Sequence, residues 1–443
     1  MTFFRATLPP PMRRASTLAI VVVMALGVLA ALLWPRAPKP ATRPAAPSVG
    51  EAPTSSRDAS LVRIEAQTRA AERSGSWVDW DVVAALWMDR ADAGGGLEDL
   101  GRASEAIDRA FTLASPGVGP HLRAAVLAFR LHRLDDCETL LEPLDRYAVS
   151  SAEERVTVAS LRADIAFFRG EYDAARAAYE GAVASGPDPA ALVALARLEW
   201  STGHVERASA LLERAEAADT GAQLTRYLAL ARTSLARERG DLAAAEREVG
   251  AALRARRGDE DAALVFAEIL VERGEHARAE QVLARLPDSA RFHELGARIA
   301  RARGDTITEE EHAAAALRDL ETSFAAFPEA VAGHALPCFL RFGPLDRAVE
   351  IAELNARARP FGEARARLAL TYLRAGRAGD AAAEIEAVLA TAWSTGDSHA
   401  VAAEIFDAVR DPRASEQRAL AEARAPGVTA RVSDLAPLTP PNR

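Results

Sequence analysis

The 443-residue chain is poor in the residue types on which several common protein classes depend. It has two cysteines, Cys137 and Cys338, and only 6% aromatic residues. One disulfide between them is the alternative, but each lies in an apolar stretch, so we expect two buried structural thiols, and the cysteines decide little about the compartment. Ala, Leu, Arg and Glu are abundant instead. Because these residues lose little side-chain entropy in a helix, the composition predicts an all-α protein.

Recognisable catalytic and metal-binding motifs are also missing. No pair of the eight histidines has the four-residue spacing, with an intervening glutamate, of a zinc protease helix. The glycines at 94–96 lack the lysine and hydroxyl residue of a phosphate-binding loop. The one compact ligand-like cluster, at 309–312, is interpreted as a solvated helix face. We therefore expect no metal, no cofactor and no enzymatic activity. An uncharacterised enzyme accessory role centred on 305–320 stays open as an alternative.

Negative charge dominates most of the chain. Only two of the 63 acidic residues lie in the first 60 positions, against seven of the 54 Lys and Arg residues, so the rest carries a net charge of about −14. Binding to nucleic acid relies on a positive field that neutralises phosphates. The charge distribution therefore predicts that nucleic acid is not a partner.

A single long apolar run lies near the N-terminus. Residues 15–34 contain no charged side chain, and twenty helical residues span about 30 Å, enough to cross a bilayer core. The sequence after the run, Trp34-Pro35-Arg36, lacks a small-x-small cleavage site. We therefore predict a single transmembrane helix at 15–34 rather than a cleaved signal peptide, after a short N-terminal segment at 1–14.

A linker rich in Pro and Ala follows at 35–60, and it is too polar and too irregular to bury a core. Three bases precede the apolar run and three follow it closely, so the distribution of positive charge hardly decides the orientation. The very short leading segment favours a cytoplasmic N-terminus. We expect a single-pass protein of the inner (plasma) membrane with its body in the periplasm or otherwise outside the cytoplasm.

Glycines recur at nearly regular intervals through the body of the chain. Neighbouring members of the series are 30 to 39 residues apart, which is the length of a helix–turn–helix repeat: Gly170, Gly203, Gly240, Gly274, Gly304, Gly343 and Gly376. His132 occupies the same turn position in an earlier unit. The segment after Gly304 is irregular, and its 39-residue interval predicts a longer helix or a bend in the array.

The clearest copy of the unit runs from Ala159 to Pro187. It places small residues where two helices would cross closely, a glycine at the turn, aromatic residues in the second helix and a closing proline: Ala163, Gly170, Tyr172, Ala175, Tyr179, Ala182 and Pro187. This pattern resembles the tetratricopeptide repeat (TPR) family. The resemblance covers 61–425, about eight or nine units, and leaves 426–443 as a flexible tail. It implies an all-α fold, a right-handed α-solenoid of stacked helix–turn–helix repeats.

The resemblance also implies a function. In such arrays the first helix of each hairpin lines a concave groove that binds proteins or peptides. The groove positions project onto Asp164, Phe168, Arg197, Trp200, Tyr227, Arg237, Glu268 and Glu272. For Phe168 and Trp200, packing between hairpins is the competing interpretation. We expect a membrane-anchored TPR scaffold or adaptor for protein partners; a cytoplasm-facing regulatory subunit that recruits soluble factors is the alternative.

Overall fold

A computed structural model of the protein describes residues 56–92, 96–146, 151–185, 189–218, 222–256 and 258–435. Every regular element in these ranges is helical, as the composition predicted. None of the described helices is both long and apolar enough to cross a membrane. The predicted transmembrane helix at 15–34, the linker as far as 55, Pro187 and residues 436–443 lie outside the described residues.

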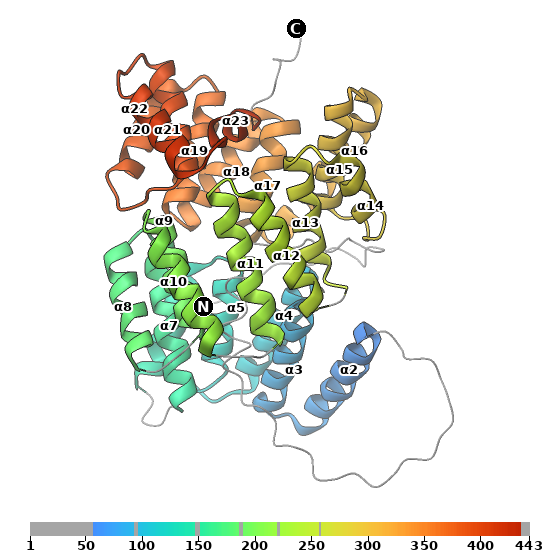
Figure 1. The fold of residues 1–443 in the computed structure, drawn as a ribbon. Coiled ribbons are helices and arrows are strands. Elements are labelled where there is room, and N and C mark those ends of the chain that lie inside the picture. The colour runs from blue at the N-terminus through green and yellow to red at the C-terminus, as the bar shows by residue number, and fades with distance from the viewer. Residues whose placement is uncertain are drawn as a thin grey trace.

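Ten helical hairpins follow one another in the described part of the chain, between an initial helix α2 and a final helix α23 (Figure 1). The helices of the first five hairpins, with α2, are α2 (Ser56–Ser74), α3 (Trp77–Arg90), α4 (Gly96–Leu113), α5 (His121–Arg130), α6 (Leu134–Leu141), α7 (Ala152–Phe168), α8 (Tyr172–Ser185), α9 (Pro189–Ser201), α10 (Val205–Ala218), α11 (Ala222–Glu238) and α12 (Leu242–Ala255). A short 3₁₀ helix, η2 (Glu142–Arg146), follows α6.

The second five hairpins and the last helix are α13 (Glu260–Glu272), α14 (His276–Leu283), α15 (Ala290–Arg303), α16 (Thr306–Ala326), α17 (Pro328–Phe342), α18 (Leu345–Ala358), α19 (Gly362–Arg374), α20 (Ala378–Leu389), α21 (Gly396–Ala408), α22 (Ala414–Arg424) and α23 (Val428–Ser433). The odd-numbered helix comes first in each hairpin. Both cysteines are buried and unpaired, as expected.

All seven glycines of the series lie between the two helices of a hairpin, so the predicted turn positions are confirmed. Six of the seven have a positive φ, and His132, at the turn of an earlier hairpin, has a φ of 60°. Gly343 instead has φ −95° and ψ 174°, an extended conformation. Pro344 follows it, and a residue before proline is sterically driven out of the helical region and into the extended one. At this position the proline ends the helix.

Two helices lie partly or wholly in segments that the sequence predicted to be irregular, and one predicted long helix is present. Helix α2 begins at Ser56, inside the predicted linker. Helix α23 lies inside the predicted flexible tail, where Val428 is fully buried and Val432 is 3% exposed. Two buried valines one turn apart fix this helix against the array. The longer helix predicted after Gly304 is confirmed, because α16 extends over 21 residues.

The solenoid closes on itself, which the repeat pattern did not predict. Gly170, Gly203 and Gly240, at the turns of three successive hairpins, each approach the C-terminal half: respectively Pro360, Arg424 and Pro426. Figure 1 shows the orange and red hairpins lying against the ends of the green helices α9 and α11. The Gly240 turn has a φ of 70°, and a Cβ added there would lie 2.6 Å from the carbonyl oxygen of Pro426. Only glycine satisfies both conditions.

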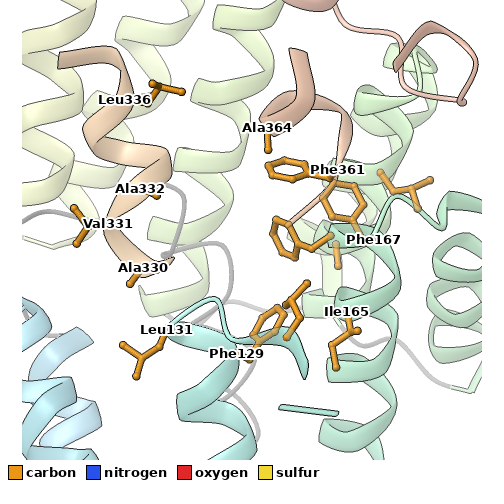
Figure 2. Packing of buried hydrophobic residues seen from close by; sticks show 14 of the residues in the cluster. Phe129, Leu131, Ile165, Phe167, Ala330, Val331, Ala332, Leu336, Phe361 and Ala364 are labelled. Atoms are coloured by element: carbon orange, nitrogen blue, oxygen red, sulfur yellow. The ribbon is translucent and has the colours of Figure 1, made fainter. Parts of the chain in front are cut away.

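An aromatic cluster forms the centre of this closure. Phe167 and Phe168, at the end of α7, contact Phe361 from the α18–α19 connection, with ring centroids 6.1 and 5.1 Å away. Trp393, before α21, packs on Phe361 with centroids 5.6 Å apart. Figure 2 shows the Phe361 ring beside Phe167, with Phe129 of α5 below them. All four rings of the cluster are at most 5% exposed, so the two halves share one hydrophobic core.

Backbone hydrogen bonds reinforce the aromatic closure. The amide of Gly362 donates to the Tyr172 hydroxyl at 2.8 Å, and the amide of Ser394 donates to the carbonyl oxygen of Ser201 at 2.8 Å. Buried amides need such partners. Since each bond joins residues about 190 apart in sequence, the closure also fixes the register of the two halves.

A buried histidine makes a second contact across the closure. His132 is 1% exposed, and its Nδ1 lies 3.1 Å from the carbonyl oxygen of Glu329. Its Nε2 lies 3.2 Å from Nη1 of Arg359. A guanidinium only donates, so Nε2 accepts and Nδ1 carries the proton. Burial, with the charge of Arg359, lowers the pKa of His132 well below its usual value.

We predict that Phe361→Ala lowers the stability of the protein by about 3–5 kcal/mol, the usual effect of truncating a buried phenylalanine. The midpoint of urea unfolding would measure this change. Leu420→Ala is the control, because Leu420 is 37% exposed, and it should change stability by less than about 1 kcal/mol. Equal effects of the two substitutions would contradict the closure.

We also predict that His132 makes the protein sensitive to acid. Because its folded-state pKa is lowered, the unfolded chain binds the proton first, and stability is lost as pH falls below about 6.5. In His132→Asn this contribution disappears, while Asn tolerates the positive φ. Urea unfolding of both proteins at pH 7.5, 6.5 and 5.5 should show a shallower loss in the variant, by at most about 1.4 kcal/mol per pH unit. Parallel losses would rule this role out.

Candidate functional site

The eight predicted groove residues separate into two groups. Asp164, Phe168, Arg197, Trp200 and Tyr227 lie on α7, α9 and α11 in the first half. The other three, Arg237, Glu268 and Glu272, lie towards the ends of α11 and α13. The first group is mostly enclosed by protein, and the second is partly accessible to solvent.

A buried polar link holds α7, α8 and α9 together. Asp164 accepts hydrogen bonds from the hydroxyl of Tyr179 at 2.5 Å and from Nη2 of Arg197 at 2.7 Å. Burial raises the pKa of Asp164, and Arg197 opposes that rise. The Arg197 guanidinium also stacks over the Phe167 ring, 4.3 Å from its centroid. Asp164 is 2% and the Arg197 side chain 13% exposed, so this link ties the three helices together inside the array.

The aromatic members of the first group also pack internally. Phe168 belongs to the closing aromatic cluster, Tyr227 is 6% exposed, and Trp200 packs partly buried against the main core. The packing interpretation therefore holds for Phe168 and Trp200. The prediction of an open groove is wrong at Phe168, because Phe361 of the C-terminal half covers its ring.

The second group forms an ion-pair cluster between α11, α13 and α15. Arg237 contacts Glu268 at 3.3 Å and also pairs with Glu272. Glu268 further contacts Arg291 at 2.6 Å and Arg298 at 3.9 Å. Burial acts to raise the pKa of Glu268, but the three arginines outweigh it and lower the pKa. Glu268 is therefore ionised at any physiological pH.

A second set of charged side chains, on the C-terminal hairpins, lies near the end of α11. Glu238, next to Arg237, has its pKa raised to about 8 by burial, with Asp397 of α21 and Glu363 of α19 adding like charge. Arg367 of α19 balances part of this negative charge, since Glu363, Asp397 and Glu238 all raise its pKa against the opposing effect of burial. First helices far apart in sequence thus bring their charged side chains to one place.

We call these side chains the inner charged cluster: Arg237, Glu238, Glu268, Glu272, Arg291, Arg298, Glu363, Arg367, Asp397 and Arg431. Although protein surrounds them, they are not sealed from solvent: Arg237 is 28% and Asp397 48% exposed. The sequence prediction included Arg237, Glu268 and Glu272 but missed Glu238 and all the members from Arg291 onwards. The same first-helix register, continued into α15, α19 and α21, would have pointed to them.

The inner charged cluster presents ionic side chains that can bind a partner. Among the described residues, no group of three or more His, Cys, Asp and Glu side chains could hold a metal ion. The cluster instead presents carboxylates and guanidinium groups in alternation, and both can form charge-assisted hydrogen bonds with a partner.

Comparison with known proteins identifies the repeat type. The tetratricopeptide repeat family model matches residues 167–232 and 236–302. These stretches run from the end of α7 to the last turn of α15, and they confirm the predicted resemblance for the middle of the chain. They also contain six of the ten residues of the inner charged cluster. No curated protein matches the chain.

Solved structures with similar helical arrangements come from several organisms. PilF of Pseudomonas aeruginosa is 18% identical, over 46% of this chain and 93% of that one, with a TM-score of 0.35. A tetratricopeptide repeat protein of Parabacteroides merdae is 16% identical, over 64% and 98%, with a TM-score of 0.36. The human IFIT1 dimer with m7Gppp-AAAA is 13% identical, over 81% and 94%, at 0.38. At these values the partners of those proteins do not transfer to this chain.

The raised pKa of Glu238 predicts a stability that falls with rising pH. The folded state holds a proton that the unfolded chain releases above about 4.3, so stability is lost progressively as pH rises from there towards the folded pKa of about 8. Glu238→Gln removes this loss. We expect the variant to be more stable than the unmodified protein at pH 8.5, and the difference to shrink at pH 5, in urea unfolding.

Glu310→Gln is the matched control, because Glu310 is exposed on α16. It removes the same charge outside the inner charged cluster and should leave the pH dependence unchanged. If Glu238→Gln has the same pH dependence of stability as this control, then the pKa of Glu238 is not raised by burial and by the like charges of Asp397 and Glu363.

Proposed function

We propose that this protein is a TPR scaffold that binds a segment of a partner protein through the inner charged cluster, and that it is not an enzyme. The observation that carries the proposal is the convergence of charged side chains from α11, α13, α15, α19, α21 and α23, several of them still partly exposed. An ion pair that is partly exposed adds little to folding stability. The same groups can exchange partners at small energetic loss when a ligand arrives.

The charge pattern indicates what kind of segment would fit. The carboxylates of Glu238, Glu363 and Asp397 crowd one another, while Glu268 is shared by three arginines. A segment that places a basic side chain near the first set and an acidic one near Glu268 would relieve both imbalances. Such complementarity sets specificity and orientation more than affinity. We therefore infer a partner segment of mixed charge rather than an apolar helix.

We further propose that residues 15–34 anchor the scaffold in the inner (plasma) membrane, with the repeats outside the cytoplasm. The support is the uncharged apolar run in the sequence and the spacer of more than 20 residues before α2. A topology reporter fused after Arg443 tests the orientation. Reporter activity in the cytoplasm would favour the alternative, a regulatory subunit that recruits soluble factors.

Site-specific photocrosslinking in cells tests the binding surface. A crosslinking residue placed at Arg431, beside Asp397, should give one defined partner adduct, whereas the same residue at the exposed position Glu310 should not. We expect the double substitution Glu363→Arg and Asp397→Arg to reduce the adduct by roughly tenfold or more, as for other charge reversals at an interface.

The charge-reversal control is Asp173→Arg, because Asp173 is fully exposed on α8, away from the cluster. Thermal unfolding of each variant separates loss of binding from loss of fold. If folded double-substituted protein gives the same adduct as the control, the inner charged cluster is not the binding surface.

A further inference from the structure

Two histidines that the sequence keeps 19 residues apart meet on the α15/α16 hairpin, at the upper right of Figure 1. His293 lies in the first turn of α15 and His312 in the second turn of α16. Their Nδ1 atoms are 3.0 Å apart, and their ring centroids are 5.2 Å apart. Neither ring is buried, so solvent reaches both.

The protein around the pair holds the rings in this position. Gly296, one turn after His293, faces the ring of His312: a Cβ added there would lie 2.9 Å from three atoms of that ring. The glycine thus lets the ring rest against the backbone of α15. Phe292 contacts both imidazoles edge-on, with centroids 5.2 Å from His293 and 6.0 Å from His312. Packing on two sides limits the rotamers that each histidine can adopt.

The distance between the nitrogens suits a shared metal ion. Two nitrogens bound at about 2.05 Å lie about 2.9 Å apart at a right angle and about 3.3 Å apart at a tetrahedral angle. The observed 3.0 Å lies between these values, nearer to the square-planar geometry that Cu²⁺ and Ni²⁺ prefer. Asp288 and Asp319 place negative charge near His293, and Arg318 offsets part of it.

We propose that His293 and His312 form a two-imidazole site that binds a divalent transition-metal ion, Cu²⁺, Ni²⁺ or Zn²⁺, through their Nδ1 atoms. Water completes the coordination. In the metal-free pair, Nδ1 of one ring donates a hydrogen bond to Nδ1 of the other. The donor ring must therefore change its tautomer, passing this proton through solvent to its own Nε2, before both Nδ1 atoms can bind the ion. The move leaves each ring neutral. The bound ion joins the two helices of one hairpin.

Titration of the full-length chain with Cu²⁺, followed by calorimetry and electron paramagnetic resonance, tests the proposal. We expect one saturable ion per chain and a spectrum with two equatorial nitrogen ligands, and we expect Zn²⁺ to compete for the site. His293→Ala and His312→Ala should each weaken binding by about tenfold or more and reduce the nitrogen count. His204→Ala is the control, since the His204 side chain is 58% exposed on another hairpin.

A further variant keeps both histidines and changes only the position of the His312 ring. Gly296→Ala adds a methyl group against the His312 ring, inside a helix where alanine is favourable. It should weaken Cu²⁺ binding several-fold without lowering the thermal unfolding temperature of the metal-free protein. Cu²⁺ binding that persists unchanged in His293→Ala and His312→Ala, or that falls equally in His204→Ala, would overturn the proposal.

Discussion

The packing of Phe361 and Trp393 on Phe167 and Phe168 is the contact on which the rest of this structure depends. A TPR hairpin normally buries its apolar face against its neighbours in sequence, and the ends of the array stay apart. Here four rings from α7 and from two connections of the C-terminal half share one buried site. Each ring buries a large apolar area and gains further from its edge-to-face geometry. The array is therefore a closed body.

Closure explains why the charged side chains of the first helices are crowded. In an open solenoid these side chains would face solvent, where ion pairs are screened and weak. Because α19, α21 and α23 are brought opposite α11, Glu238 meets Asp397 and Glu363 in surroundings of lower polarity. The fold holds these like charges together through the hydrophobic energy of the aromatic contact. A site assembled in this way has lost part of its solvation before any partner arrives.

The repeat pattern predicted the hairpins well and their long-range arrangement poorly. Glycines such as Gly170 and Gly240 end a helix through their own positive φ, so a short segment of sequence is enough to predict the turn. The predicted groove position of Phe168 failed because it depends on Phe361, almost 200 residues later. Gly343 also lies at its predicted turn, between α17 and α18, but the proline that follows gives it an extended backbone instead of a positive φ. Arg237, Glu268 and Glu272 do meet, because they belong to adjacent hairpins whose spacing the sequence records.

The turns at Gly170, Gly203 and Gly240 have a consequence for how this protein is made and how it can change. During synthesis, these turns emerge from the ribosome before the residues that will pack against them, such as Pro360 and Pro426, have been made. At about 5–20 residues per second, the wait lasts roughly 10–40 s. Phe167 and Phe168 are uncovered for that time, which is a period of exposure to aggregation and to chaperones. Open repeat arrays evolve by gaining or losing whole units. A unit inserted between α12 and α17 would displace the C-terminal hairpins from their contacts with the turns of the first half. The closure therefore fixes the number of units in this array.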